Sequence, residues 1–346
     1  MRLKLTKGEI VIHSKENQFQ ANLIKKEILA IVVPCYNEEE VLPETASQLL
    51  KKIQSLVSSN IISSESKILF VDDGSTDNTW AMIEKFCENN PQHFAGIKLS
   101  KNKGHQNALL CGLYLMKDIV DVTISIDADL QDDINAIDEM MEKYGAGCEI
   151  VYGVRSERKK DSFAKKITAQ GFYKFMKFLG ADIVYNHADF RLMGKTALSA
   201  FAEYQETNIF IRGIVPLLGF KTDVVYYSRQ ERFAGVSKYP LKKMLQFALN
   251  GITSFSIRPI RLITLIGIAL FTISVLMIIY SFYRHYSGNT IIGWASIVCS
   301  LWGIGGLILF SIGIVGEYIG KIYLETKNRP KYHVEQFLFR RNNQKD

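Results

Sequence analysis

Two long runs without a charged residue dominate the C-terminal third of this 346-residue chain. One run extends from Leu262 to Tyr283 and the other from Ile291 to Gly316. About 20 apolar residues in a helix are enough to cross the hydrocarbon core of a bilayer, which is roughly 30 Å thick. Because only Arg284–Thr290 separates the two runs, the sequence predicts two transmembrane helices in a hairpin whose outer ends lie on the same side.

Basic residues flank this hairpin and predict its orientation. Arginines precede it and lysines and an arginine follow it, so the positive-inside rule places both termini in the cytoplasm of a multi-pass membrane protein. The first 27 residues are polar and contain no apolar core of signal-peptide length. The five cysteines are scattered, which is typical of reduced thiols in the cytosol. The flanking residues are Arg258, Arg261, Lys321, Lys327, Arg329 and Lys331.

Upstream of the hairpin, apolar runs alternate with helical patterns. This alternation predicts an α/β fold with a mainly parallel, Rossmann-like sheet, in which ligands bind beyond the carboxyl ends of the strands. We expect a polar extension over 1–27, a catalytic domain over 28–236, a juxtamembrane helix over 237–258, the hairpin over 259–320 and a basic tail over 321–346. The expected strands are 28–34, 67–71, 95–99, 122–127 and 149–153, and the expected helices are 39–56, 77–88, 105–116 and 134–144.

The excess positive charge is concentrated in one segment. Arg155–Lys177 contains eight basic and two acidic residues and so carries +6 of the net +7. Such a patch suits a nucleic acid or an anionic membrane surface. The hairpin favours the membrane, and no nucleic-acid-binding module is recognisable. The patterns of segments 161–180 and 237–258 then predict amphipathic helices that lie in the membrane interface. The alternative is that these helices pack on the sheet and expose a basic face to solvent. The membrane-surface candidates are Lys165, Lys166, Lys174 and Lys177.

Acidic motifs follow three of the expected strands. The first strand ends in Pro34-Cys35-Tyr36-Asn37-Glu38-Glu39. The second strand ends in Asp72 and Asp73 before a Gly-Ser-Thr-Asp turn, which presents carboxylates and backbone N–H groups to a polar ligand. The fourth ends in Asp127-Ala128-Asp129, where two carboxylates two residues apart can hold a divalent metal through hard oxygens. Ordinary strand–helix turns and surface acidic clusters are the alternative interpretation. A bridging metal would neutralise a departing pyrophosphate.

Taken in order, these motifs resemble a known enzyme family. PCYNEEE, VDDGSTD, NKGHQNAL and DADLQD resemble glycosyltransferase family 2, which has the GT-A nucleotide-sugar fold. DFRLM, and RFAGVSKY ahead of SFSIRPIR, resemble its polyprenyl-phosphate branch, which includes relatives of dolichyl-phosphate mannose synthase with C-terminal membrane helices. The resemblance covers residues 28–317. It says little about the sugar.

The resemblance implies a role for each matching residue. Asp189, Asp127 and Asp129 are expected to be catalytic, with Asp189 acting as a base or as an orienting group. His105 departs from the Lys or Arg common among relatives, which weakens any expectation of a phosphate contact there. The residues expected to bind the nucleotide sugar are Pro34, Tyr36, Glu38, Asp72, Asp73, Asp127 and Ala128. The expected ligands of Mg²⁺ or Mn²⁺ are Asp127, Asp129 and Gln131. The residues expected to bind the lipid phosphate or the diphosphate are Arg212, Arg229, Arg232 and Lys238.

The expected activity is inverting transfer of one hexose or N-acetylhexosamine to undecaprenyl or another polyprenyl phosphate on the cytoplasmic leaflet, for modification of cell-envelope glycans. Glucose and N-acetylglucosamine are the favoured sugars and UDP the favoured nucleotide. No Q-x-x-R-W motif is present, which disfavours a processive synthase. The alternatives are a diacylglycerol-type acceptor and a non-catalytic membrane-anchored nucleotide-sugar-binding subunit. Glycines at 303, 305 and 306 indicate close helix packing and a homo-oligomer, of which a tetramer is one candidate.

Overall fold

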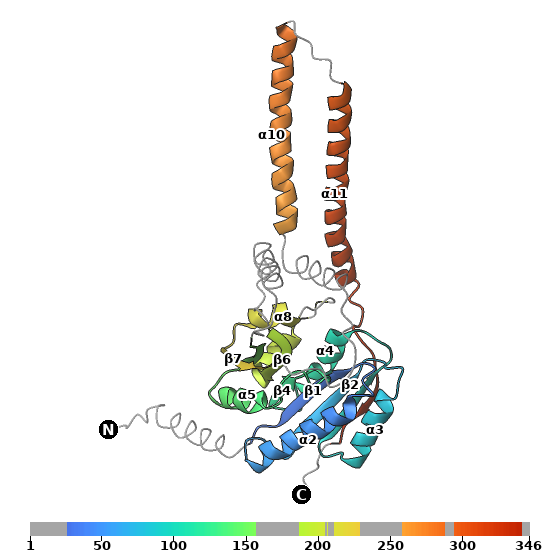
Figure 1. The fold of residues 1–346 in the computed structure, drawn as a ribbon, viewed down its shortest axis with the longest axis vertical. Helices are drawn as coiled ribbons and strands as arrows, with labels where there is room; N and C mark the ends of the chain where they lie inside the picture. Colours follow the sequence, from blue (N-terminus) through green and yellow to red (C-terminus); the bar gives the residue numbers. More distant parts are fainter. Residues whose placement is uncertain are drawn as a thin grey trace, which may run out of the picture.

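The computed structural model describes residues 26–156, 187–204, 206, 211–228, 258–287 and 294–340. In Figure 1 these residues form a layered α/β domain from which two long helices extend side by side. The expected amphipathic segment 161–180 and all but the last residue of 237–258 lie outside the described residues. So do seven predicted site residues, which are Lys165, Lys166, Lys174, Lys177, Arg229, Arg232 and Lys238.

A single eight-stranded sheet organises the described part of the domain, in the order β7-β5-β6-β4-β1-β2-β3-β8. The pairs β1–β2, β1–β4, β2–β3 and β5–β7 are parallel, whereas β6 and β8 run antiparallel to their neighbours. The prediction of a mainly parallel α/β sheet is therefore confirmed. The strands are β1 Leu29–Cys35, β2 Lys67–Asp72, β3 Phe94–Leu99, β4 Val122–Ser125, β5 Ile150–Arg155, β6 His187–Gly194, β7 Thr222–Tyr227 and β8 Val334–Leu338.

Helices cover both faces of this sheet, which is why the central strands β1, β2 and β4 are buried at every position. β1 is buried at every position, as expected for a parallel strand between two layers of helices. One apolar core lies between the sheet and helices α2, α3 and α5, and a second lies between the sheet and α4, α7 and α8. The helices are α2 Leu42–Ser58, α3 Thr79–Asn89, α4 His105–Met116, α5 Ala136–Gly145, α7 Lys195–Ala202 and α8 Ile211–Ile214.

Most element boundaries differ from the expected ones by a few residues. The helix expected from 39 begins at Leu42, with Pro43 in its first turn, where a missing N–H costs nothing. The strand expected to reach 127 ends at Ser125, the last residue that pairs with β1 and β6. The sequence reading contained no strand at β6 or β7. Both pair with β5, so their place in the sheet depends on a partner distant in the sequence.

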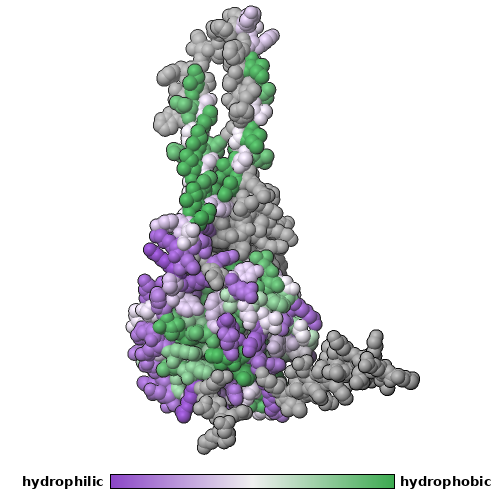
Figure 2. Space-filling model, turned by 180° about the vertical axis from the view of Figure 1, so that it is seen from behind, coloured by the Kyte–Doolittle hydropathy of each residue, from purple (hydrophilic) through white to green (hydrophobic). Residues whose placement is uncertain are grey.

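The C-terminal hairpin consists of α10, Arg258–Tyr286, and α11, Trp294–Thr326. The described surface of both helices is mostly hydrophobic in Figure 2. Among the described residues, Gly303–Thr326 is the one segment long and apolar enough to cross a membrane, and none of it is buried within the protein. Unburied apolar helices of this kind indicate membrane association. Helix α11 ends ten residues later than the expected boundary at 316, close to Asn328 and Pro330.

After α11 the chain returns to the sheet, so residues 321–346 are not simply a basic tail. β8 pairs antiparallel with the edge of β3, with Lys98 opposite Gln336. Lys98 Nζ lies 3.0 Å from an oxygen of Glu335. Three aromatic or aliphatic residues of this segment pack against the two cores, namely Tyr332, Leu338 and Phe339. β8 therefore covers an edge that would otherwise present unpaired backbone groups.

Ending the chain at Asn328 removes β8 and its packing residues. We expect the Tm of the purified full-length protein in detergent to fall by about 5–10 °C, because about three partly buried apolar side chains and one edge ladder are lost. A chain ending at Arg340 keeps β8 and should melt like the complete protein. Equal Tm values for the two truncations would show that β8 adds no stability.

Candidate active site

The pairing of β6 with β4 brings two sequence motifs together at the carboxyl edge of the sheet. Ser125 lies opposite Arg191 in the antiparallel register. Asp127 lies two residues after Ser125 and Asp189 two residues before Arg191, so this antiparallel pairing brings the two residues to the same end of the two strands. The Ser125 hydroxyl donates to the backbone oxygens of both Asp189 and Arg191, which fixes the strands in this register.

One imidazole lies between the two carboxylates. Nε2 of His105, the first residue of α4, is 3.4 Å from Oδ1 of Asp127 and 3.7 Å from Oδ2 of Asp189. Gly104 places this histidine by adopting a φ of 90°, a left-handed value that suits glycine. His105 is thus central to the site, although its departure from the family pattern had made its role doubtful.

Asp189 is held by a two-point ion pair with Arg212 from α8. Nε of Arg212 donates to Oδ1 at 3.0 Å and Nη2 donates to Oδ2 at 2.9 Å. Arg191, which is buried, lies 3.8 Å from Oδ1. Burial alone raises the pKa of Asp189, but Arg212, with help from His105 and Arg191, holds that pKa well below its ordinary value. Asp189 is therefore a stable carboxylate and a poor base.

Asp127 has the opposite character. Burial raises its pKa to about 6, the negative charges of Asp189, Asp132 and Asp129 act in the same direction, and His105 opposes them. Its Oδ1 is buried and faces Nε2 of His105 at 3.4 Å, but it accepts no hydrogen bond from the described residues. A buried carboxylate oxygen without a donor is costly unless a cation or a ligand meets it. This oxygen suits a divalent cation.

The loop after β4 places further oxygen ligands beside Asp127. Leu130 adopts a φ of 54°, and the Gln131 N–H donates to Oδ1 of Asp129 at 3.2 Å, so the loop turns back on itself. Within the described ranges, no three His, Cys, Asp or Glu side chains converge on one metal position. A metal here would therefore take part of its coordination from water or substrate phosphate, as Mg²⁺ commonly does.

The acidic pair after β2 has a structural use. The buried Asp73 carboxylate accepts the N–H groups of Lys103 at 2.7 Å and Gly104 at 2.8 Å, and so holds the loop that leads to His105. Asp72 accepts the N–H of Ser75 at 3.3 Å. Gly74, with a φ of 67°, lies where a Cβ would come within 2.6 Å of the Lys101 backbone. These contacts fix the loops that follow β2 and β3.

The remaining predicted nucleotide residues lie on the same edge. Pro34 and Tyr36 come at the end of β1, whose Cys35 pairs with Asp72 of β2, and the Tyr36 side chain is 39% exposed. The Glu38 N–H donates to Oγ1 of Thr79 at 2.9 Å. The Ala128 carbonyl accepts the hydroxyl of Thr45 at 2.7 Å.

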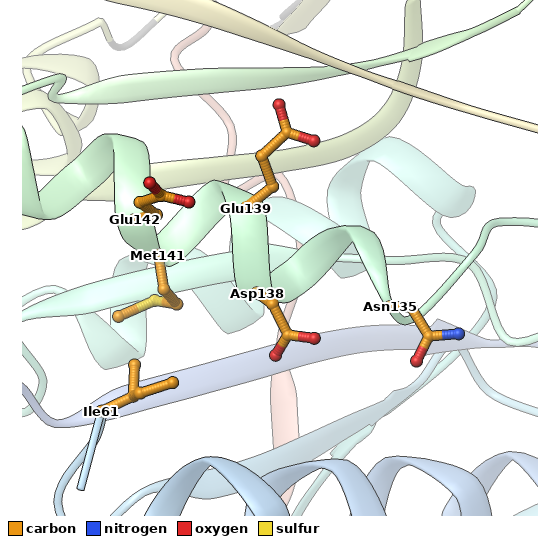
Figure 3. A pocket seen from close by; sticks show the side chains of 6 residues that line it. All are labelled: Ile61, Asn135, Asp138, Glu139, Met141 and Glu142. Carbon is orange, nitrogen blue, oxygen red and sulfur yellow. The ribbon is translucent and has the colours of Figure 1, made fainter. Parts of the chain in front are cut away.

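A pocket of about 590 Å³ lies elsewhere, beside helix α5. Figure 3 shows its lining, which is acidic on the α5 side. Asp138, one of its residues, is 2.6 Å from Nζ of Lys52. None of the predicted site residues lines this pocket, so it is not the candidate active site. Its lining residues are Ile61, Asn135, Asp138, Glu139, Met141 and Glu142.

Comparison with known proteins agrees with the motifs and the fold. Residues 30–201 match Glycosyl transferase family 2, and residues 258–322 match the GtrB C-terminal hairpin. The uncharacterized glycosyltransferase YkoT of Bacillus subtilis (strain 168) is 55% identical over 312 residues, which cover 90% of this chain and 92% of the relative. The bactoprenol glucosyl transferase of Shigella phage SfII is 38% identical over 313 residues, which cover 89% and 97%. The chain is therefore a glycosyltransferase that belongs to family 2 and carries the GtrB-type C-terminal hairpin.

Proposed function

We propose that this enzyme transfers a single sugar from a nucleotide sugar to a polyprenyl phosphate at the membrane surface. The observation that carries the proposal is the meeting of Asp127 and the Asp189–Arg212 pair around His105. In this arrangement Asp127 can bind the metal ion that accompanies the donor, and Arg212 is oriented to bind an anionic acceptor. Relatives named bactoprenol glucosyl transferase support glucose and a polyprenyl acceptor. We take N-acetylglucosamine as the second candidate sugar and UDP as the candidate nucleotide.

The donor is expected to bind along the ends of β1, β2 and β4. Asp127, Asp129 and Gln131 would hold Mg²⁺ or Mn²⁺ together with the donor diphosphate. A metal ion here fits the Oδ1 of Asp127, which is buried and accepts no hydrogen bond from the described residues. The ion, when bound, neutralises the charge of the leaving diphosphate. The nucleoside would lie over Pro34, Tyr36 and Glu38, with Asp72 and Asp73 supporting the loops beneath it.

The acceptor side of the site needs positioning rather than a base. A lipid phosphate is already ionised near neutral pH, so its oxygen can attack once repulsion from the donor is relieved. Arg212 can supply this relief because its side chain is 33% exposed while Asp189 holds its orientation. Asp189, with its lowered pKa, acts as an orienting group. The phosphate oxygen then attacks the anomeric carbon, the bond to the diphosphate breaks, and the configuration inverts.

The hairpin suits an acceptor that arrives from a membrane. Figure 1 shows α8, which carries Arg212, at the end of the domain that faces the hairpin. We place the domain and both termini in the cytoplasm, and α10 and α11 across the membrane. Together with Arg212, the residues proposed to bind the lipid phosphate or the diphosphate are Arg229, Arg232 and Lys238. The residues proposed to contact lipid headgroups are Lys165, Lys166, Lys174 and Lys177.

The test is an assay of the full-length enzyme in detergent with undecaprenyl phosphate, a panel of nucleotide sugars, and Mg²⁺, Mn²⁺ or chelator. We expect glycosylated undecaprenyl phosphate from UDP-glucose with metal and none with chelator, read by mass spectrometry of the lipid. Transfer to diacylglycerol instead would favour the second enzymatic reading. No transfer from any donor would leave a non-catalytic nucleotide-sugar-binding subunit and overturn the proposal.

A double-mutant cycle tests the Asp189–Arg212 pair. Asp189→Asn should lower kcat/KM for the lipid acceptor by about 100-fold, since a correctly placed electrostatic group contributes roughly that much. Arg212→Gln should cost a similar factor. The double variant should lose much less than the product of the two, because both changes disrupt one unit. The same change at the exposed Asp118, which pairs with Lys117 at 3.6 Å, should leave activity unaltered. Fully multiplicative losses would contradict the pairing.

A further inference from the structure

The loop that carries the expected metal ligands is anchored by a residue to which the sequence assigned no role. Asp132 is completely buried, five residues after Asp127. Its Oδ1 accepts hydrogen bonds from Nε of Arg155 at 3.2 Å, from Nη2 of Arg155 at 2.9 Å, and from the Tyr227 hydroxyl. The Asp132 side chain therefore connects the loop to two separate strands.

These two partners lie at equivalent places in the sheet. Arg155 is the last residue of β5 and Tyr227 is the last residue of β7, and the two are paired in the parallel register. Nε of Arg155 also lies 3.3 Å from the Tyr227 hydroxyl, so the three side chains form a closed cluster. The chain continues from Arg155 into the basic segment and from Tyr227 toward Arg229 and Arg232.

The second carboxylate oxygen of Asp132, Oδ2, differs from Oδ1 in its surroundings. Oδ2 is buried and, like Oδ1 of Asp127, accepts no hydrogen bond from the described residues. Two buried carboxylate oxygens without donors therefore belong to one short loop. Such an arrangement is unfavourable unless cations compensate for the negative charge: Arg155 does so for Asp132, and a bound metal would do so for Asp127. Residues behind metal ligands commonly fix the ligands in this way.

We propose that Asp132, held by Arg155 and Tyr227, is a positioning residue that keeps the 127–131 loop in the conformation that binds a divalent metal. The inference rests on the proposed function, because it takes the metal-dependent donor site as given. It adds that the metal loop is fixed from the ends of β5 and β7, the strands that lead to the basic segment and to the proposed phosphate-binding arginines.

The experiment measures UDP binding to the full-length protein in detergent by calorimetry, with saturating Mn²⁺ and with chelator. Mn²⁺ should strengthen UDP binding to the wild type by about 10-fold or more, within the range usual for coupled ligands. Asp132→Asn should abolish most of this strengthening while leaving UDP binding in chelator unchanged, since loss of a supporting residue typically costs metal sites 10-fold to 100-fold in affinity.

Asp133→Asn is the matched control. It makes the same chemical change one residue away, where the carboxylate accepts hydrogen bonds from Asn135 at 2.9 and 3.0 Å. It should keep the Mn²⁺ effect within about 2-fold of the wild type, because its contacts lie outside the proposed metal loop. Tyr227→Phe removes one donor to Asp132, keeps the ring, and should reduce the Mn²⁺ effect partially. It decides the question if Asp132→Asn does not fold.

The outcomes separate this inference from the proposed function. A wild type whose UDP affinity is indifferent to Mn²⁺ would overturn both the proposed metal use and the role of Asp132. A clear Mn²⁺ effect in the wild type that persists in folded Asp132→Asn and Tyr227→Phe would overturn the role of Asp132 alone.

Discussion

The antiparallel pairing of β6 with β4 is the contact on which the candidate site depends. The parallel strands β1, β2 and β4 end at one edge of the sheet, where the predicted nucleotide-sugar residues lie. β6 runs back along β4 and sets Asp189 against Asp127, within reach of the same imidazole. Arg212 then neutralises Asp189, whereas the buried Oδ1 of Asp127 has only the imidazole of His105 beside it and accepts no hydrogen bond from the described residues.

The connection between the domain and its hairpin follows from the same sheet. β7 and β8 are its two outer strands. The chain enters the hairpin after β7 and returns from it into β8, so the two helices are tied to opposite edges of one sheet. Ladder pairing and the Lys98–Glu335 contact hold the returning segment. Such a double attachment suits an enzyme that must keep its site at a fixed height above a lipid surface.

Sequence reasoning predicted what is local and missed what depends on distant partners. Strand β2, which ends in Asp72, and strand β4, which precedes Asp127, were recognisable because burial between two helix layers requires continuous apolar runs. Strand β8 was not recognisable, because it is short and pairs with a strand that is distant in the sequence. Glu335 of β8 and its partner Lys98 of β3 are 237 residues apart. Asp73 was predicted to contact the nucleotide sugar, and its carboxylate also accepts two backbone N–H groups, which the sequence did not predict. A motif gives the residue type at a strand end, whereas only packing determines which atoms remain available.

The central claim is that Asp189 is held in an ion pair and attacks nothing, so transfer takes place in one displacement by the lipid phosphate. The anomeric configuration of the product tests this most directly, by NMR of the glycosyl phosphate formed from an α-linked nucleotide sugar. The account predicts a β-linked product. An α-linked product would require a covalent intermediate or a front-face attack, and would contradict the role given to the Asp189–Arg212 pair.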